Sequence, residues 1–216
     1  MAWLDSRNEV TQAGLNREIR KACAHLGACD PVVASLIDAH GPYRLKATSN
    51  YFQVLLETIV SQQLSTKAAR AIYRRLVDNL GRRTPGPARV RAATDSQLLG
   101  AGLSRSKATY VRNVADAFCL RRLGPKTFGR MTDAEVVDTL VSIKGIGQWS
   151  AHMFLIFALA RLDVFPIGDL GLRNAMKAQY RLRRDPSDKR LHSISDRWRP
   201  YRTVGTLYLW KSYDSN

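Results

Sequence analysis

The most informative segment of this chain covers residues 140–172 and reads LVSIKGIGQWSAHMFLIFALARLDVFPIGDLGL. It begins with a short turn that contains Gly145 and Gly147, continues as an apolar segment from about Gln148, and ends in a loop that closes on Asp169. Glycine lets the backbone turn tightly and approach another molecule closely. Backbone amides at the start of a helix have no partner within that helix and can bind an anion. The segment therefore predicts two helices joined by a hairpin that can contact a phosphate group.

A Gly-x-Gly turn by itself is weak evidence, because the same residues also form tight connections between helices. The Walker pattern for nucleotide phosphates is absent, since the region of Gly145 has neither the four-residue spacer nor the Gly-Lys-Ser/Thr sequence. Lys144 beside the turn, and the apolar Ile146 between the two glycines, suit a DNA phosphate better than a nucleoside triphosphate. At this level both interpretations, phosphate contact and structural connection, stay open.

The whole segment is more specific, and it resembles the helix-hairpin-helix DNA glycosylases of the HhH-GPD superfamily. In that family a hairpin is followed by a Gly/Pro-rich loop and an aspartate, and here the loop is Phe-Pro-Ile-Gly-Asp at residues 165–169. Residues 59–65 (IVSQQLS), residues 198–202 (WRPYR) and residues 209–210 (LW) also agree. The resemblance covers roughly residues 50–211 and is nearest to the 3-methyladenine DNA glycosylase II (AlkA) type.

An all-α fold is expected, because apolar residues recur with a helical period and few segments alternate with period two. We expect residues 1–216 to form a single HhH-GPD glycosylase unit, a two-lobed helical bundle with a helix-hairpin-helix DNA-binding motif. The expected lobes are a central one over residues 48–130 and a hairpin-containing one from residues 1–47 plus 131–216. The AlkA type proper carries a further N-terminal β-containing domain, for which this chain is short, so we expect the compact form.

Several helix starts are predicted from capping residues. These signals are Asp30 before Pro31, Asn50 with Gln53, Ser65, Thr94 with Gln97, and Thr132 with Glu135. We also expect helices over residues 104–123, 170–179 and 200–213. An exposed charged loop is expected over residues 181–190, and a loose end over residues 1–12.

The charge of the chain indicates a polyanionic partner. There are 34 Lys and Arg residues against 18 Asp and Glu residues, which gives a formal net charge of +16. Nucleic acid is the first candidate for such a partner. An anionic membrane is the rival, but the basic residues are spread through the chain and do not form one polybasic helix or tail. A merely soluble basic surface is the remaining alternative.

Cysteine and histidine usage predicts neither a cofactor nor a metal centre. Cys23, Cys29 and Cys119 form no paired framework, which fits a reduced cytosolic setting. The C-terminal region has no cysteine, so we do not expect the cysteine-ligated iron–sulfur cluster that some relatives carry. The four histidines lack metal-ligand spacing. Because the sequence shows no signal peptide and no transmembrane run, we expect the protein in the cytoplasm and nucleoid, or in the nucleus of a eukaryote, with no membrane partner. We also expect a monomer.

Asp169 is the candidate catalytic residue. The resemblance implies this role, because Asp169 occupies the position of the family's catalytic aspartate at the end of the Gly/Pro loop. A carboxylate can stabilise the positive charge that grows on deoxyribose when a base leaves, and can orient a water molecule. Spacing alone favours a structural role instead, as the N-cap of the helix that begins at Leu170. Both roles are compatible.

Aromatic residues are expected to bind the damaged base. The resemblance places Trp149 and Trp210 in the base pocket, where a flat, electron-poor alkylated purine would stack; the alternative for each is a core aromatic. Met153 falls where the AlkA type has a pocket tyrosine, a departure that leaves the base preference open. Bifunctional relatives have a lysine near Trp149 that attacks the sugar. This chain has Gln148 and Trp149 there, so it should release the base without cutting the strand.

The remaining contacts with DNA are assigned by the resemblance. The residues of the DNA-binding hairpin are Lys144, Gly145, Ile146, Gly147 and Gln148. Gln63, with Leu64 second, is the expected wedge that fills the space left by a flipped base; the alternative is a buried helix junction. A monovalent cation bound by backbone carbonyls of the hairpin is a further expectation. Those carbonyls would belong to Val141, Ile143 and Ile146.

The resulting functional prediction is a monofunctional DNA glycosylase that excises alkylated bases of the 3-methyladenine and 7-methylguanine type from double-stranded DNA. A mismatch or oxidised-base glycosylase of the same fold is one alternative. A non-catalytic DNA-binding module, which uses the hairpin only for phosphate contacts, is the other.

Overall fold

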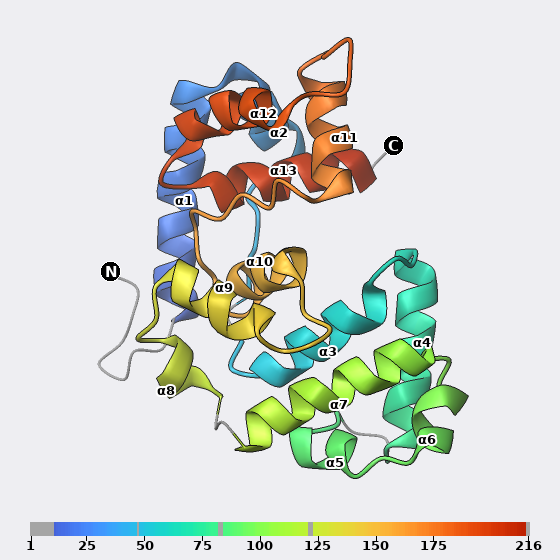
Figure 1. The fold of residues 1–216 in the computed structure, drawn as a ribbon. Helices are drawn as coiled ribbons and strands as arrows, with labels where there is room; N and C mark the ends of the chain where they lie inside the picture. The colour runs from blue at the N-terminus through green and yellow to red at the C-terminus, as the bar shows by residue number, and fades with distance from the viewer. Residues whose placement is uncertain (1–10, 47, 82–83, 121–122, 215–216) are drawn as a thin grey trace. The chain divides into compact units, whose positions relative to one another are not determined.

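The computed structural model describes residues 11–46, 48–81, 84–120 and 123–214, and every regular element among them is a helix (Figure 1). This confirms the predicted all-α class. The elements in chain order are α1 (Gln12–Cys29), α2 (Pro31–His40), α3 (Tyr51–Ser61), α4 (Thr66–Asn79), α5 (Pro87–Arg91), α6 (Asp95–Gly100), α7 (Arg105–Leu120), α8 (Pro125–Phe128), α9 (Asp133–Val141), α10 (Gln148–Phe157), α11 (Leu170–Gln179), α12 (Asp188–Ser195), the 3-10 helix η1 (Asp196–Trp198) and α13 (Arg202–Asp214). None of the described helices is both long enough and apolar enough to cross a lipid bilayer.

The predicted caps explain why most of these helices begin where they do. Asp30 accepts hydrogen bonds from the first amides of α2, and Ser65 accepts one from Ala68 in α4. Thr94 and Thr132 each form a reciprocal capping box with the residue three positions later. Asn50 also caps α3, because its side-chain oxygen accepts from the backbone amide of Gln53. The reciprocal half of its box differs, since the Gln53 side chain accepts from the side-chain amide of Asn50 while the Asn50 backbone amide donates to Thr48.

Some boundaries differ from the sequence-based expectation. Residues 181–190 are only partly a loop, because α12 begins at Asp188, where Ser187 supplies the cap and Leu191 and Ile194 supply a buried face. The short helices α5 and α8 were not expected. The expected helix over residues 104–123 ends as α7 at Leu120, and residues 121–122 lie outside the described part. The expected loose end, residues 1–12, lies mostly outside it as well, although Thr11 already caps α1.

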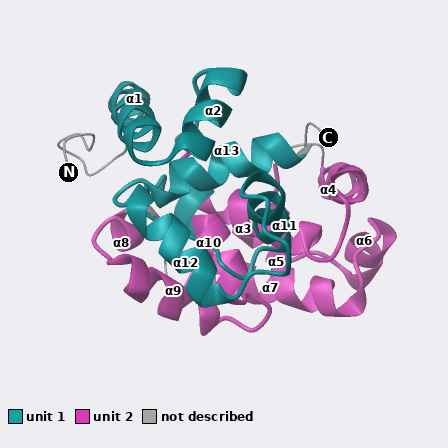
Figure 2. Ribbon diagram, turned by 90° about the horizontal axis from the view of Figure 1, so that it is seen from above, with its two compact units in different colours: residues 1–47, 155–216 teal, residues 48–154 magenta. Residues whose placement is uncertain are grey.

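The chain divides into two compact units, shown in Figure 2. Unit 1 combines residues 1–47 with residues 155–216, and unit 2 is residues 48–154. The expected lobes differ in one respect: residues 131–154, which include the hairpin, belong with the central helices and not with the chain ends. Side chains explain this grouping, because Asn113 of α7 donates to the carbonyl oxygen of Lys144 and α10's Phe154 packs against Phe128 within unit 2.

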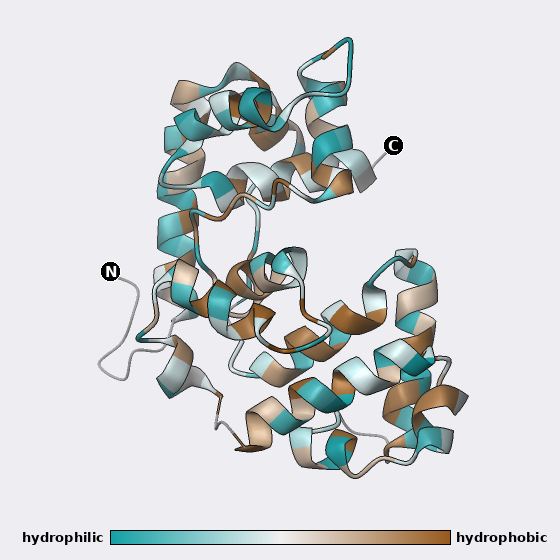
Figure 3. Cartoon of the chain, viewed as in Figure 1, coloured by the Kyte–Doolittle hydropathy of each residue, from teal (hydrophilic) through white to brown (hydrophobic). Residues whose placement is uncertain are grey.

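Each unit has its own apolar core. In unit 1, α13 packs against α1, α2 and α11 and buries Val204, Leu207, Tyr208 and Leu209. In unit 2, α3 packs against both α4 and α7, and Figure 3 shows apolar residues in brown along α3. Burial of such side chains contributes about 1.5–3 kcal/mol each. These cores fix the helices from which the candidate functional side chains project.

Candidate functional site

Asp169 lies in unit 1, at the end of the loop between α10 and α11. Its backbone amide donates to the carbonyl oxygen of Pro166 at 2.8 Å, which closes the turn. Its Oδ1 accepts a 2.6 Å hydrogen bond from the backbone amide of Leu172, as an N-cap of α11. The structural role expected from spacing is therefore confirmed. The carboxylate also sits at the positive end of the α11 dipole.

Trp210 of α13 holds the same carboxylate oxygen. Its indole Nε1 donates to Asp169 Oδ1 at 2.8 Å. The indole ring is stacked on Phe157, with ring centroids 6.0 Å apart and an angle of 20° between the planes. The family resemblance implies a base-pocket role for Trp210, but no signal in the sequence predicts this hydrogen bond, which joins residues 41 positions apart. Two fixed donors therefore orient one oxygen of the candidate catalytic group.

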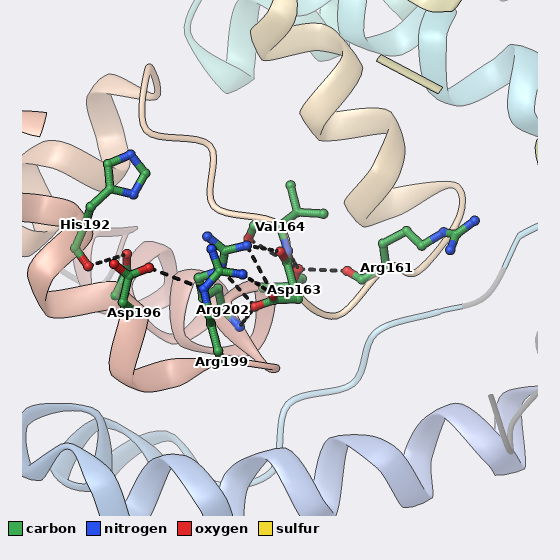
Figure 4. A network of polar contacts seen from close by, with 9 residues as sticks. Arg161, Asp163, Val164, His192, Asp196, Arg199 and Arg202 are labelled. Carbon is green, nitrogen blue, oxygen red and sulfur yellow. Dashed lines mark hydrogen bonds and ion pairs between the residues drawn. The ribbon is translucent and has the colours of Figure 1, made fainter. Parts of the chain in front are cut away.

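A network of polar contacts ties the loop before Asp169 to the start of α13 (Figure 4). Asp163 accepts two hydrogen bonds from the guanidinium of Arg202, at 2.8 and 3.0 Å, and one from Arg199 at 2.9 Å. The hydroxyl of Thr203 accepts from the amide of Val164 and donates to a carbonyl oxygen of the same loop. Paired, planar Arg–carboxylate contacts of this kind are rigid. Since α13 also carries Trp210, the loop and the helix that hold Asp169 are anchored to each other at two places.

The hairpin lies in unit 2 and depends on Gly145. This residue has φ of +108°, a conformation that side-chain-bearing residues rarely adopt. A Cβ added there would lie 2.3 Å from Cγ of Tyr110, whereas one added at Gly147 would meet nothing within 4 Å. Lys144, Gly147 and Gln148 are exposed. The open space at Gly147 is compatible with a phosphate at the start of α10, and the contact of the hairpin with DNA stays a prediction.

Two side chains that the sequence analysis did not assign hold the expected wedge in place. Gln62 donates from Nε2 to the carbonyl oxygen of Gly145 at 3.2 Å and to the hydroxyl of Ser150 at 3.1 Å. Lys107 donates from Nζ to the carbonyl oxygens of Val60 and Gln62 at 2.7 and 2.8 Å, so it caps the end of α3. Burial lowers the pKa of Lys107. No local signal could reveal these contacts, because they join residues at least 45 positions apart.

The wedge residues themselves are exposed. Gln63 has φ of +57°, in the left-handed region, and Leu64 is 39% exposed. A non-glycine residue in this region persists only when its surroundings impose it. The hydrogen bonds of Gln62, and those of Lys107 to the carbonyl oxygens of Val60 and Gln62, fix the backbone immediately before Gln63 and supply that constraint. The buried helix junction considered as the alternative is therefore wrong for Gln63 and Leu64.

At least one of the three carbonyl oxygens expected to bind a cation already accepts a backbone hydrogen bond. The carbonyl oxygen of Ile143 accepts a 3.0 Å hydrogen bond from the amide of Ile146, and Val141 is the last residue of α9. A carbonyl oxygen has two lone pairs, so this bond leaves capacity for a cation. The monovalent cation stays a prediction. Among the described residues, no group of three or more His, Cys, Asp or Glu side chains could hold a metal ion.

Trp149, His152 and Met153 lie on the part of α10 that belongs to unit 2. Trp149 is half-buried, and Met153 is only 6% exposed. Their assignment to a base pocket stays a prediction. His152, which lies between Trp149 and Met153 in the sequence, is half-buried. Its burial lowers its pKa, while the charge of Asp133 acts in the opposite direction.

The lowered pKa of His152 predicts a loss of stability in mild acid. Below the ordinary value of 6.5, the unfolded chain takes up a proton at this ring before the folded chain does. The free energy of unfolding therefore falls as the pH drops from 6.5 towards the folded-state pKa. We expect the free energy of unfolding of His152→Gln to change less between about pH 7.5 and about pH 5.5 than that of the wild type. Urea titrations at the two pH values measure this difference. Equal pH dependence in the two proteins would contradict this prediction.

The glycine hairpin between α9 and α10, braced by side chains of neighbouring helices and followed by a helix-capping aspartate, defines a helix-hairpin-helix protein. The chain belongs to the HhH-GPD superfamily of base excision DNA repair proteins, whose family model matches residues 56–200. The resemblance drawn from the sequence is thereby confirmed.

Individual relatives agree with this membership. The chain is 32% identical over 200 residues to DNA-3-methyladenine glycosylase 1 of Schizosaccharomyces pombe. This match covers 90% of this chain and 87% of the S. pombe protein. The solved structure of the S. pombe 3-methyladenine DNA glycosylase in complex with abasic DNA is similar with a TM-score of 0.83 and 31% identity, over 90% of this chain and 97% of that one. A crystal structure of DNA-3-methyladenine glycosidase from Bacillus halodurans is similar with a TM-score of 0.76 and 37% identity, over 89% and 88% of the two chains.

Proposed function

We propose that this protein is a DNA glycosylase that removes alkylated bases, of the 3-methyladenine and 7-methylguanine type, from double-stranded DNA by hydrolysing the N-glycosidic bond. The observation that carries the proposal is the carboxylate of Asp169, held by Trp210 and by the start of α11. It occurs in a chain similar to proteins named 3-methyladenine DNA glycosylases. In this proposal the protein acts as a monomer in base excision repair, in the cytoplasm and nucleoid or in the nucleus of a eukaryote.

The proposed chemistry depends on charge. A duplex hides its bases, so the damaged nucleotide is first turned out of the stack. As the bond to the base breaks, positive charge develops on the deoxyribose, and the Asp169 carboxylate stabilises it and orients the attacking water. An alkylated purine already carries positive charge and leaves readily. The donors on Oδ1 keep the carboxylate in place, so little reorganisation is needed during the reaction.

The hairpin and the wedge have separate roles in this proposal. Lys144 and the backbone from Gly145 to Gln148 bind a DNA phosphate, for which the exposed residues of the hairpin leave room. Gln63 or Leu64 enters the duplex where the base has left. Trp149 and Met153 of α10 contact the flipped base.

The enzyme is proposed to be monofunctional. No lysine stands at Gln148 or Trp149, where bifunctional relatives have the amine that forms a Schiff base with the sugar. The product is therefore an intact strand with an abasic site.

Base release from methylated duplex DNA tests the function directly. DNA treated with a methylating agent is incubated with the protein, and the released bases are separated by chromatography. We expect free 3-methyladenine and 7-methylguanine, an abasic strand that breaks only after alkali, and no covalent complex after borohydride. Tight DNA binding without release would support a binding module, and release only from mismatched or oxidised substrates would support the other glycosylase class.

Replacement of Trp210 by phenylalanine should slow the reaction without unfolding unit 1. Phenylalanine keeps an aromatic ring against Phe157 but lacks the N–H that donates to Asp169. A hydrogen bond to a charged group contributes about 1.5–3 kcal/mol, so we expect base release to slow by roughly 10- to 100-fold. Single-turnover rates at saturating DNA measure this effect. An unchanged rate would show that the indole N–H does not orient the carboxylate.

A further inference from the structure

The segment at the far end of α11 from Asp169 carries a cluster of cations that the proposed chemistry does not use. Residues 181–190 read RLRRDPSDKR and join α11 to the first turn of α12. We call this segment the basic loop, and Figure 1 shows it projecting beyond the end of α11. Its exposed cations are Arg181, Arg183, Arg184, Lys189 and Arg190.

Both acids of the basic loop are already neutralised by cations of α11. Asp185 pairs with Lys177 at 2.5 Å, and Asp188 pairs with Arg173 at 2.6 Å. The carboxylate of Asp185 has a lowered pKa because of its hydrogen bond with Lys177. In the described part of the chain, the five exposed cations make no side-chain hydrogen bond or ion pair. The loop therefore presents unneutralised positive charge to a partner outside this chain.

The base of the loop is held rigidly, and it is held to the segment that leads to Asp169. The guanidinium of Arg173 donates to the carbonyl oxygen of Pro186 at 2.7 Å and to that of Ile167 at 3.3 Å. Pro186 is buried. One side chain thus connects the basic loop with the residue two positions before the candidate catalytic aspartate.

The chemistry of the loop fits phosphate groups and does not fit the interior of a membrane. Its two apolar residues, Leu182 and Pro186, are half-buried and buried, and it has no aromatic residue. Four of its five cations are arginines, three of them before α12, and their planar guanidinium groups can bind a phosphate through two parallel hydrogen bonds. A duplex carries a phosphate charge for every 1.7 Å or so of its axis, so closely spaced cations meet several phosphates.

The length of α11 places this charge within reach of the same duplex. Its ten residues span about 15 Å from Asp169 to the start of the loop. One turn of B-DNA is about 34 Å long. A duplex that delivers a nucleotide to Asp169 therefore has backbone phosphates within one turn of the lesion at the distance of the loop.

We propose that the basic loop is a second DNA-binding surface, which holds backbone phosphates flanking the damaged nucleotide independently of sequence and of damage. It rests on the proposed function only in taking duplex DNA as the substrate. It assigns to unit 1 a phosphate contact of its own, in addition to the hairpin of unit 2. The loop contributes affinity and has no part in breaking the glycosidic bond.

The test compares the salt dependence of binding to undamaged duplex DNA. The variant is Arg183→Gln with Arg184→Gln, and the matched control is Arg20→Gln with Arg44→Gln, two other exposed arginines of unit 1 without a described side-chain partner. Each phosphate contact contributes about 0.9 to the slope of log K against log salt concentration. We expect the loop variant to lower the slope by about 1.8 and to weaken binding by about 10- to 60-fold at about 0.1 M salt.

Three further measurements make the result specific. Arg183→Lys with Arg184→Lys should keep the wild-type slope, because the charge is kept. Shortening the duplex on one side of the centre should weaken binding by the wild type and leave the Gln variant unaffected. Single-turnover base release at saturating DNA should be unchanged in the Gln variant.

An unchanged slope in the Gln variant, or an equal loss in the Arg20 and Arg44 control, would overturn the proposal. The first result would indicate that the loop binds an acidic protein partner and not DNA. The second would show that the effect depends only on the net charge of the protein. A slower single-turnover release would place the loop in catalysis and would also overturn it. Because binding is measured on undamaged DNA, absence of base release alone would reject the proposed function and leave this inference standing.

Discussion

Asp169→Asn is expected to release methylated purines at least about 10²–10³ times more slowly than the wild type, while it stays folded and binds DNA. Asparagine keeps the oxygen that accepts from Leu172 and from Trp210, and it is as good an N-cap as aspartate. Only the negative charge is lost. Since the proposed role of Asp169 is to stabilise a cationic sugar, loss of charge without loss of geometry isolates that role.

The measurement is the single-turnover rate of base release, at protein concentrations that saturate the DNA for each variant. Asp38→Asn is the matched control, because it removes the same charge from an exposed side chain of unit 1. We expect the control to react at the wild-type rate. If Asp169→Asn retained more than about a tenth of the activity, the carboxylate would not supply a catalytic electrostatic effect of the usual size, and another residue would have to activate the water.

Gly145→Ala should produce the largest structural effect of a single methyl group in this protein. Alanine is strained at φ of +108°, and its Cβ would lie 2.3–2.6 Å from atoms of Tyr110. Strain and overpacking together cost about 2–5 kcal/mol. In a chain of 216 residues this lowers the melting temperature by roughly 4–20 °C. The displaced hairpin should also lose its phosphate contact.

Gly147→Ala is the control within the same hairpin. A Cβ at this position meets nothing within 4 Å, so stability should stay within about 0.5–1 kcal/mol of the wild type. Thermal unfolding and binding to undamaged duplex DNA measure the two effects separately. Equal melting temperatures for the two alanine variants would show that the close packing of Gly145 on Tyr110 does not stabilise the hairpin.

Much of the secondary structure could be predicted because its signals are local. Ser65, Thr94 and Thr132 were recognised as caps, since a cap acts on an amide two or three residues later. The start of α12 was missed because the charges of residues 181–190 hide a short amphipathic pattern that continues to Leu191 and Ile194. The extent of the central lobe was wrong for a different reason, since contacts such as that of Asn113 with the hairpin join residues 31 positions apart.

Sequence by itself determined the helical class, the hairpin, and the position of Asp169 at a helix start, because glycine conformation, capping and apolar period act over a few residues. Membership of the family followed from the same motifs. The tertiary structure alone decided which side chains hold the site: Trp210 on Asp169, Gln62 on the hairpin, and Lys107 at the end of α3. These donors lie between 41 and 83 positions from their acceptors. A hydrogen bond over that separation forms only when packed cores bring two helices together, so no local pattern encodes it.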